Sequence, residues 1–218
     1  MTIAKENATK LRNDIIEIKR ERILTEAVNL FYEHGYLPTS VDAIAQQLGA
    51  TKPFVYYHFK NKVDLLSEVC MRVMEEALMI SEAATKSEGS PMDRLTEFVL
   101  RFTDLALTRH KYVSIYFREE LNLPAPVNEK IREFRKRIDY LIRSILKDGQ
   151  RTSDFEPVNL LIASQIITGM ISYTFAWYNE KNSVSHGDIK RHMLEGVLRL
   201  IVVDQSEVQN VIKGCAFD

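Results

Sequence analysis

The chain has 218 residues, 45% of them hydrophobic, a share that supports a packed core and excludes disorder as the main state. The 29 Lys and Arg residues nearly balance the 30 Asp and Glu residues, so the net charge is −1 and any nucleic acid must be held by a local basic patch. Eight glycines and six prolines are too few for a turn-rich β-sandwich or barrel. The two cysteines lack disulfide-framework or zinc-site spacing, and the charged N-terminus predicts no export, so we expect a cytoplasmic protein.

Helical periodicity predicts an all-α protein with nine helices. Gly35 and Gly49 stand where helices are expected to end in a left-handed residue. In chain order the expected elements are a helix from about Asp14 to His34, short helices capped by Ser40 and by Thr51, a long helix capped by Asn61, and helices over about residues 91–109, 112–121, 126–148, 157–178 and 186–203. The tail from residue 204 has no clear pattern.

The run from Pro157 to Asn179 contains no charged residue, and this length is typical of a membrane span. Polar side chains are scattered through it, among them Gln165 and Thr168, and each would need an internal partner in lipid. A helix buried on several sides within a soluble protein explains the pattern better. We therefore expect no membrane partner.

The segment from Ser40 to Phe59 has the spacing of a helix-turn-helix, whose second helix fits the major groove of DNA. Val55 and Phe59 are four residues apart and are expected to pack inward. Lys52, Pro53 and Tyr56 then lie on a different face, which is free to meet base edges. Between residues 51 and 62 there are three lysines and no acidic residue, so the basic patch that the balanced chain requires is present.

This patch allows roles to be assigned as hypotheses. Lys52 can donate to guanine O6 and N7, and Tyr56 can offer its hydroxyl to a base edge or phosphate. Phosphate contacts are expected from the ends of the short helices and the start of the fourth. The full candidate set is Ser40, Thr51, Lys52, Pro53, Tyr56, Tyr57, His58 and Lys62. In the alternative, the aromatic residues are half-buried packing and the lysines are only solvated.

Residues 22–66 resemble the DNA-binding domain of the tetracycline-repressor (TetR) family of bacterial transcription regulators. The resemblance is carried by the helix end at Gly35, the Thr39-Ser40-Val41 cap, the Gly49 turn, the Tyr-x-His-Phe run at residues 56–59, and Asn61-Lys62. It implies an all-α homodimer with a ligand pocket in its C-terminal domain and repression of an operator that a small molecule relieves. It also implies base contacts from Lys52, Pro53 and Tyr56, and phosphate contacts from Ser40, Thr51, His58 and Lys62. We expect residues 1–66 to form the DNA-binding domain with its N-terminal extension, and residues 67–218 to bind ligand and form the dimer.

The N-terminal extension before this domain carries six basic residues against four acidic ones. It could be an arm that enters the minor groove, as in some DNA-binding domains. Because its acids nearly cancel its bases, a frayed, solvated lead-in is the favoured interpretation.

Two stripes in the C-terminal half predict a dimer surface. Small residues recur at steps of three and four in the uncharged run, and apolar residues recur likewise in the helix after it. Two such helices from each subunit can close a four-helix interface across a twofold axis. The candidate interface residues are Gly169, Ser172, Ala176, Ile189, Met193, Val197 and Leu200. The alternative is that both stripes are buried within one chain.

Other faces are rich in large flexible and aromatic groups that can line an apolar cavity, although each alone fits ordinary core. The candidate ligand-binding residues are Met74, Phe98, Phe102, Tyr116, Phe134, Met170, Tyr173 and Trp177. Residues 129–151 hold eight basic residues against four acidic ones, and this excess could receive an anionic head group or form a solvated helix face. Residues 116–124 and 162–179 are similar to family members that sense acyl-CoA thioesters in fatty-acid or steroid breakdown, which implies a hydrophobic or acyl-CoA effector. The alternative effector is a drug or aromatic compound at an efflux operon.

Two other classes of function compete with a regulator. An enzyme would be expected to show a nucleotide loop, a nucleophile elbow or an HExxH motif, and none occurs; we therefore expect no catalysis, cofactor or metal. A helical interaction protein without DNA would not show binding that weakens steeply with salt. The predicted mechanism is linkage, in which a ligand bound among the fourth, seventh and eighth helices tilts the fourth helix and changes the separation of the two reading helices.

Overall fold

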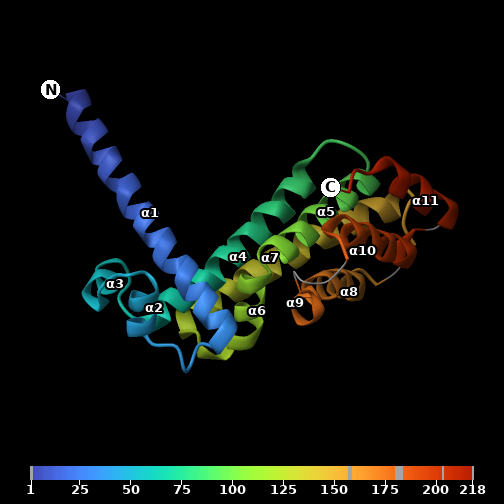
Figure 1. The fold of residues 1–218 in the computed structure, drawn as a ribbon. Coiled ribbons are helices and arrows are strands. Elements are labelled where there is room, and N and C mark those ends of the chain that lie inside the picture. The colour runs from blue at the N-terminus through green and yellow to red at the C-terminus, as the bar shows by residue number, and fades with distance from the viewer. Residues whose placement is uncertain (1, 157–158, 180–183, 203, 218) are drawn as a thin grey trace. The chain divides into compact units, whose positions relative to one another are not determined.

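The computed structural model describes residues 2–156, 159–179, 184–202 and 204–217. Every regular element in these ranges is a helix, and their one pairing of extended backbone is an isolated bridge between Phe155 and Val202 (Figure 1). The all-α class predicted from the sequence is therefore confirmed.

The chain divides into two units, each with its own internal contacts. The first unit is Met1–Met71 with Ser114–Asn128, and it contains α1 (Thr2–His34), α2 (Val41–Gln47), α3 (Lys52–His58), the start of α4 (Lys62–Lys86), the end of α6 (His110–Glu119) and the 3-10 turn η1 (Glu120–Asn122). The second unit is Arg72–Val113 with Glu129–Asp218, and it contains the rest of α4, α5 (Pro91–Thr108), most of α7 (Ala125–Arg151), α8 (Leu160–Ser172), α9 (Thr174–Trp177), α10 (His186–Ile201) and α11 (Gln205–Gly214). The domain boundary expected at residue 66 stays a prediction.

Glycine and serine set the ends of the helices around α2. Gly35 has φ +86° and donates from its amide to the Phe31 carbonyl at 3.0 Å, which closes α1. Ser40 is extended, and its hydroxyl oxygen accepts from the Ala43 amide at 3.1 Å, so it caps α2 as predicted. Gly49 turns the chain toward α3 with φ +65°. Both glycines occupy the left-handed region of backbone conformation, which a residue with a Cβ adopts only at a cost in steric strain.

The core of the first unit joins α1, α2 and α3. Ile23, Phe31, Ile44, Val55 and Phe59 are all at most 2% exposed, and each of these helices contacts the other two. Their burial removes large apolar side chains from water, which is the main stabilising contribution to such a small three-helix unit. The outer faces of α2 and α3 are thereby left for function.

Arg20 ties α1 to two other helices of the same unit. Its guanidinium lies 4.3 Å from the centre of the Phe59 ring, donates to the His58 carbonyl at 2.5 Å, and pairs with Glu68 of α4 at 3.5 Å. A planar guanidinium can stack and donate at the same time. The C-terminal end of α3 is therefore held against α1.

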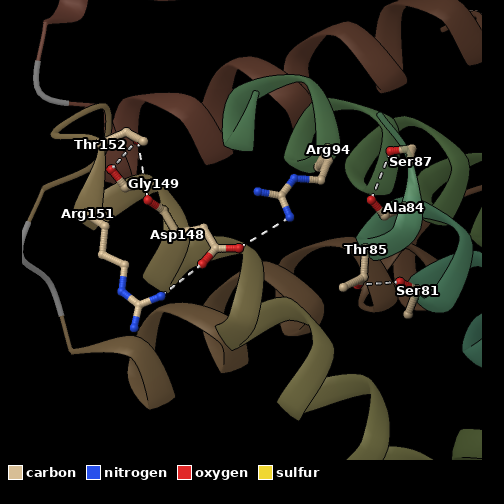
Figure 2. Close-up of polar contacts among 9 residues, drawn as sticks. All are labelled: Ser81, Ala84, Thr85, Ser87, Arg94, Asp148, Gly149, Arg151 and Thr152. Carbon is tan, nitrogen blue, oxygen red and sulfur yellow. Dashed lines mark hydrogen bonds and ion pairs between the residues drawn. The ribbon is translucent and has the colours of Figure 1, made fainter. Parts of the chain in front are cut away.

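In the second unit, α5 packs on α8, α9 and α10. Asp148 of α7 accepts from Arg94 of α5 at 3.2 Å, and Arg151 lies 3.6 Å from the other carboxylate oxygen (Figure 2). Near the end of α4, the Thr85 hydroxyl donates to the Ser81 carbonyl at 2.8 Å. The start of α5 is fixed by a capping box between Ser90 and Asp93, which lowers the pKa of Asp93 because the carboxylate accepts from the Ser90 hydroxyl and amide.

Three helix predictions differ from the structure. The first helix begins at Thr2 and not near residue 14, because the extension is free of Gly and Pro and rich in good helix formers. The helix expected over residues 157–178 is two helices, α8 and α9, separated at Tyr173, and residues 157–158 lie outside the described part. The unassigned tail forms α11, capped by the Asp204 side chain.

By length and composition alone, Leu160–Trp177 could span a membrane. In the structure, 28% of this stretch is buried. The prediction that its helix is buried on several sides is therefore wrong for the single chain. Leu161, Ile162 and Ile166 are 54%, 58% and 45% exposed. An apolar face of α8 remains available for a partner.

Candidate nucleic-acid interface

The exposed face of α3 is the one predicted from helical spacing. Val55 and Phe59 are each 1% exposed and point into the three-helix core, whereas Lys52 and Pro53 are exposed and Tyr56 is 44% exposed. The helix is seven residues long and, at a diameter of about 10–12 Å, matches a major groove of about 12 Å width. The packing prediction for this segment is confirmed, while its contacts to bases remain a prediction.

Lys52 has a partner that spacing along α3 does not reveal. Its ammonium lies 2.6 Å from a carboxylate oxygen of Asp42 in the first turn of α2. The hydrogen bond to Asp42, followed by its charge, raises the pKa of Lys52. Such an exposed pair adds little stability, but it restricts the orientation of the lysine before any base is met.

The two helix caps differ. The Ser40 hydroxyl caps α2, as expected, and its side chain is exposed. Thr51 stands at the cap position of α3 and is exposed, but its side chain makes no capping hydrogen bond. Thr51 therefore occupies the predicted cap position, but the capping hydrogen bond expected from its side chain is not formed. A hydroxyl that caps nothing is compatible with a phosphate contact.

His58 does not suit the phosphate role predicted for it. The residue is 9% exposed, and its ring packs edge-on against Phe54 and Tyr57 at centroid distances of 5.2 and 5.0 Å. Burial, and then the charges of Lys19 and Arg20, lower the pKa of His58. A buried imidazole that is kept neutral does not attract a phosphate by charge, so the structure does not support the phosphate contact predicted for His58.

Lys62 is likewise committed to the fold. Its ammonium donates to the carbonyls of Tyr36, Leu37 and Thr39 at 2.9, 3.0 and 2.9 Å, and it lies 4.3 Å from the centre of the Tyr36 ring. An ammonium has three donors, and three carbonyls accept from this one. The predicted phosphate contact would require one of these bonds to break, so the structure gives Lys62 the role of closing the loop after α1.

The candidate ligand residues do not form one group. Tyr116 belongs to the first unit, whereas the other seven belong to the second. Phe98 and Phe102 are buried, with ring centroids 5.0 Å apart, and Met74 is 7% exposed. Phe134 and Met170 are partly buried. Tyr173 and Trp177 are 61% and 44% exposed, which contradicts their placement as walls of an enclosed pocket within one chain.

The predicted dimer residues also divide. Ile189 and Val197 are 5% and 0% exposed, because α10 turns this side to α5; Ile189 packs in a cluster with Leu107, Tyr178 and Met193. These two are core residues, and their placement at a dimer surface is wrong. The exposed or partly exposed members are Gly169, Ser172, Ala176, Met193 and Leu200.

An exposed apolar stripe runs along α8 and α9, and the sequence analysis divided some of its residues between a dimer surface and a ligand pocket. Its members are spaced by three and four residues, so those within α8 share one helix face, and Tyr173 and Trp177 continue the spacing into α9. We define this α8–α9 stripe as Ile162, Ile166, Gly169, Tyr173 and Trp177. The pattern was visible in the sequence, but the choice of which face stays uncovered depends on how α8 packs on α5 and α10.

The basic excess of α7 is largely paired. Arg132, Arg143 and Arg151 pair with carboxylates of α7 itself, whereas Lys130 and Arg137 lie 3.7 and 3.8 Å from Glu75 and Glu82 of α4. A count along residues 129–151 cannot include acids on another helix. Fewer cations of α7 are therefore left for the anionic head group that the sequence analysis placed there.

Comparisons with known proteins identify both halves of the chain. Residues 23–69 match the family of bacterial regulatory proteins named tetR, and residues 88–201 match the tetracyclin repressor-like C-terminal domain. The chain is 26% identical over 157 residues to the fatty acid metabolism regulator protein of Bacillus subtilis (strain 168), covering 72% of this chain and 81% of that protein.

Solved structures share the fold at lower identity. The ketosteroid transcriptional regulator KstR2 of Mycobacterium tuberculosis superposes with a TM-score of 0.79 at 21% identity, covering 85% of this chain and 95% of that one. AibR in complex with isovaleryl coenzyme A and operator DNA gives a TM-score of 0.70 at 21% identity, with coverages of 83% and 97%. The helix-turn-helix geometry and the two family matches lead to one conclusion: the chain belongs to the TetR family of bacterial transcription regulators.

Proposed function

We propose that this regulator is a homodimeric repressor that binds a near-palindromic operator and is released by a hydrophobic acyl-CoA-type effector. The observation that carries the proposal is the face of α3 with Lys52, Pro53 and Tyr56 exposed, while Val55 and Phe59 anchor the helix. Lys52 donates to guanine, and Tyr56 contacts a base edge or a thymine methyl group. Ser40 and Thr51 contact phosphates at the starts of α2 and α3.

The α8–α9 stripe supports the homodimer. An apolar helix face of this kind is unusual on a monomer and is typical of a surface that a partner covers. A twofold axis brings the same stripe from two copies together, with the exposed Leu200 at the end of α10 as a further contact. Two copies of α3 then read half-sites about one helical turn, roughly 34–36 Å, apart.

The relatives support the effector class. One similar protein is named for fatty acid metabolism, and one similar structure is a complex with isovaleryl coenzyme A. The buried Phe98 and Phe102 of α5 provide apolar side chains for the acyl group. Lys136 and Lys147 of α7 are exposed cations that can meet the phosphates of the coenzyme.

Release of DNA requires that the effector prefer the protein without operator. Helices α4, α6 and α7 each contribute residues to both units, so a ligand that shifts one of them in the second unit has a continuous helix leading to the first. A coupling of this kind is typically about 1–3 kcal/mol, and operator must weaken the effector by the same factor.

The proposal is tested by selecting operators from randomised duplexes with the full-length protein. Enrichment of a near-palindrome is expected. The selected duplex is then titrated with an acyl-CoA series, with coenzyme A alone and with free fatty acids, and thermal unfolding is followed in parallel. An effector at 100 times its Kd is expected to add about 2.7 kcal/mol to the free energy of unfolding.

Two results would contradict the proposal. The first is an effector Kd that is the same with and without operator, because linkage then fails. The second is release by cationic aromatic drugs but by none of the acyl compounds, which would favour a sensor at an efflux operon.

A further inference from the structure

The first unit contains a groove that the contacts proposed above for Ser40, Thr51, Lys52, Pro53 and Tyr56 do not use. It has a volume of about 420 Å³ and lies between the first half of α1 and the end of α3. Figure 1 shows this half of α1, in dark blue, rising past α3. Its walls are Leu11, Arg12, Ile15, Ile16 and Lys19 of α1, with Tyr57 and His58 of α3.

We propose that this groove receives the sugar-phosphate backbone of DNA beside the half-site that α3 reads, so that the N-terminal extension is a second wall of the DNA interface. The inference rests on the proposed function, because it places the backbone strand next to an α3 lying in the major groove. A helix about 10–12 Å wide fills a groove about 12 Å wide. Side chains at its flanks therefore meet the backbones that border the groove.

The first argument is the separation of charge around α1. Successive residues are about 100° apart on a helix of 3.6 residues per turn. Arg12 and Lys19 lie on the face that lines the groove. The acids Asp14, Glu17 and Glu21 lie roughly 130–170° away from the centre of that face. In the net charge of the extension these acids and bases nearly cancel. On the helix they project from different faces, so the face that lines the groove is positive.

The second argument is the apolar surface that lines the groove together with the two cations. Leu11, Ile15 and Tyr57 are 61%, 44% and 70% exposed, although each lines the groove. Deoxyribose presents apolar C–H groups and its phosphates present charge, so one strand of backbone matches both parts of this wall. Phosphate and sugar contacts of this kind commonly set the register of a protein on DNA.

The third argument is continuity with the reading face. Tyr57 directly follows Tyr56 on α3, so the groove begins where the exposed reading face ends. Burial lowers the pKa of the neighbouring His58 most, and the positive charges of Lys19 and Arg20 at this end of α3 lower it further. Charge complementarity and position thus both indicate DNA, and not an apolar peptide, as the occupant.

A matched pair of variants tests the proposal. Lys19→Gln and Lys10→Gln each remove one exposed positive charge from α1, but residue 10 lies on the side away from the groove. Kd is measured against salt concentration for a selected operator and for a random-sequence duplex. Lys19→Gln is expected to flatten the slope of log K against log salt by about 0.9 per subunit, or about 1.8 for a dimer. Lys10→Gln is expected to leave it unchanged.

A second measurement places the DNA directly. A hydroxyl-radical-generating reagent is tethered at Leu11→Cys and, as a control, at Asn13→Cys on another side of α1. The unsubstituted protein is treated in the same way, because Cys70 and Cys215 are also present. Cleavage flanking the half-site is expected from Leu11→Cys and not from the two controls.

Three outcomes would overturn the groove proposal: equal flattening by Lys19→Gln and Lys10→Gln, no change in slope with Lys19→Gln while DNA is still bound, or a loss of self-association with Leu11→Glu that shows a second copy in the groove. Circular dichroism melts check that each variant is folded. Failure of the proposed function is distinguishable, because the wild-type protein would then select no operator, whereas the difference between the two lysines would still be measured on random-sequence DNA.

Discussion

Residue spacing was used to predict the outward helix faces of both the helix-turn-helix and the α8–α10 region. The prediction was right for α3 and wrong for two residues of α10. In α3, the residues predicted to face inward, Val55 and Phe59, are buried, and Tyr56 is exposed. In α10, the residues predicted to face a partner, Ile189 and Val197, are buried in the chain's own core. Helical periodicity tells which residues share a face. It does not tell which neighbour covers that face.

The length of the connection explains the difference. A turn of four residues, 48–51, separates α2 from α3, so few arrangements of the pair are possible and the outward face follows from the inward one. Helix α10 is far from α5 in sequence, with α6 to α9 between them, so no short connection restricts which of its faces meets α5. The predictions below test this contrast, beginning with the region where spacing failed.

The largest effect is expected from Ile166→Asp in the α8–α9 stripe. If two copies bury this stripe, the substitution places an unpaired charge in the interface twice, at a cost of several kcal/mol, and both dimerisation and operator binding are lost. Sedimentation equilibrium measures the molecular mass in solution. Leu121→Asp is the control, because Leu121 is 97% exposed in η1. If the Ile166→Asp protein is still a dimer, the interface does not include the α8–α9 stripe.

Tyr56→Ala is expected to remove specific operator binding while leaving a folded dimer. Losing one base contact costs about 1–3 kcal/mol at each half-site, and the twofold axis doubles the loss. Fluorescence anisotropy with operator and with random-sequence DNA measures the difference. Tyr140→Ala is a matched control, because Tyr140 is 58% exposed in the other unit. An unchanged operator Kd would exclude Tyr56 from the reading face.

Lys62→Ala is expected to lower the free energy of unfolding by about 1–3 kcal/mol, because three carbonyls lose a charged donor. The salt slope of DNA binding should stay the same. Urea unfolding and a salt titration measure the two effects, with the exposed Lys60→Ala as the control. If Lys62→Ala is as stable as the wild type and its slope of log K against log salt falls by about one, Lys62 makes the phosphate contact expected from the sequence.

The smallest effect concerns pH and His58. Because burial lowers the folded-state pKa of His58 below its ordinary value of 6.5, the unfolded chain takes up a proton first as the pH falls. The stabilising contribution is complete above pH 6.5 and is lost as the pH falls through the folded-state pKa, by at most about 1.4 kcal/mol per pH unit. Urea unfolding at pH 7.5 and 5.5 should show a smaller loss in His58→Asn than in the wild type, and no such change in the exposed His34→Asn. An equal loss in wild type and His58→Asn would exclude this proton uptake.

Local chemistry made much of the fold predictable. Left-handed glycines at 35 and 49, the Ser40 cap and the proline at the start of α5 all act within a few residues, and each helix end lies where these residues indicated. Partners on other helices or loops were not predictable. Asp42 beside Lys52, the carbonyls around Lys62, and Glu75 and Glu82 beside α7 are brought there by packing.

The amino-acid order alone determined an all-α chain, a helix-turn-helix near its N-terminus and the outward face of α3, because helix caps, turns and periodicity depend on residues close together along the chain. Tertiary packing decided that Lys62 and His58 serve the fold, that Ile189 is core and Ile166 is surface, and that α3 and Tyr57 border the cationic side of α1. These outcomes depend on which helix faces meet, and that is settled by the combined burial of side chains from segments far apart in the sequence.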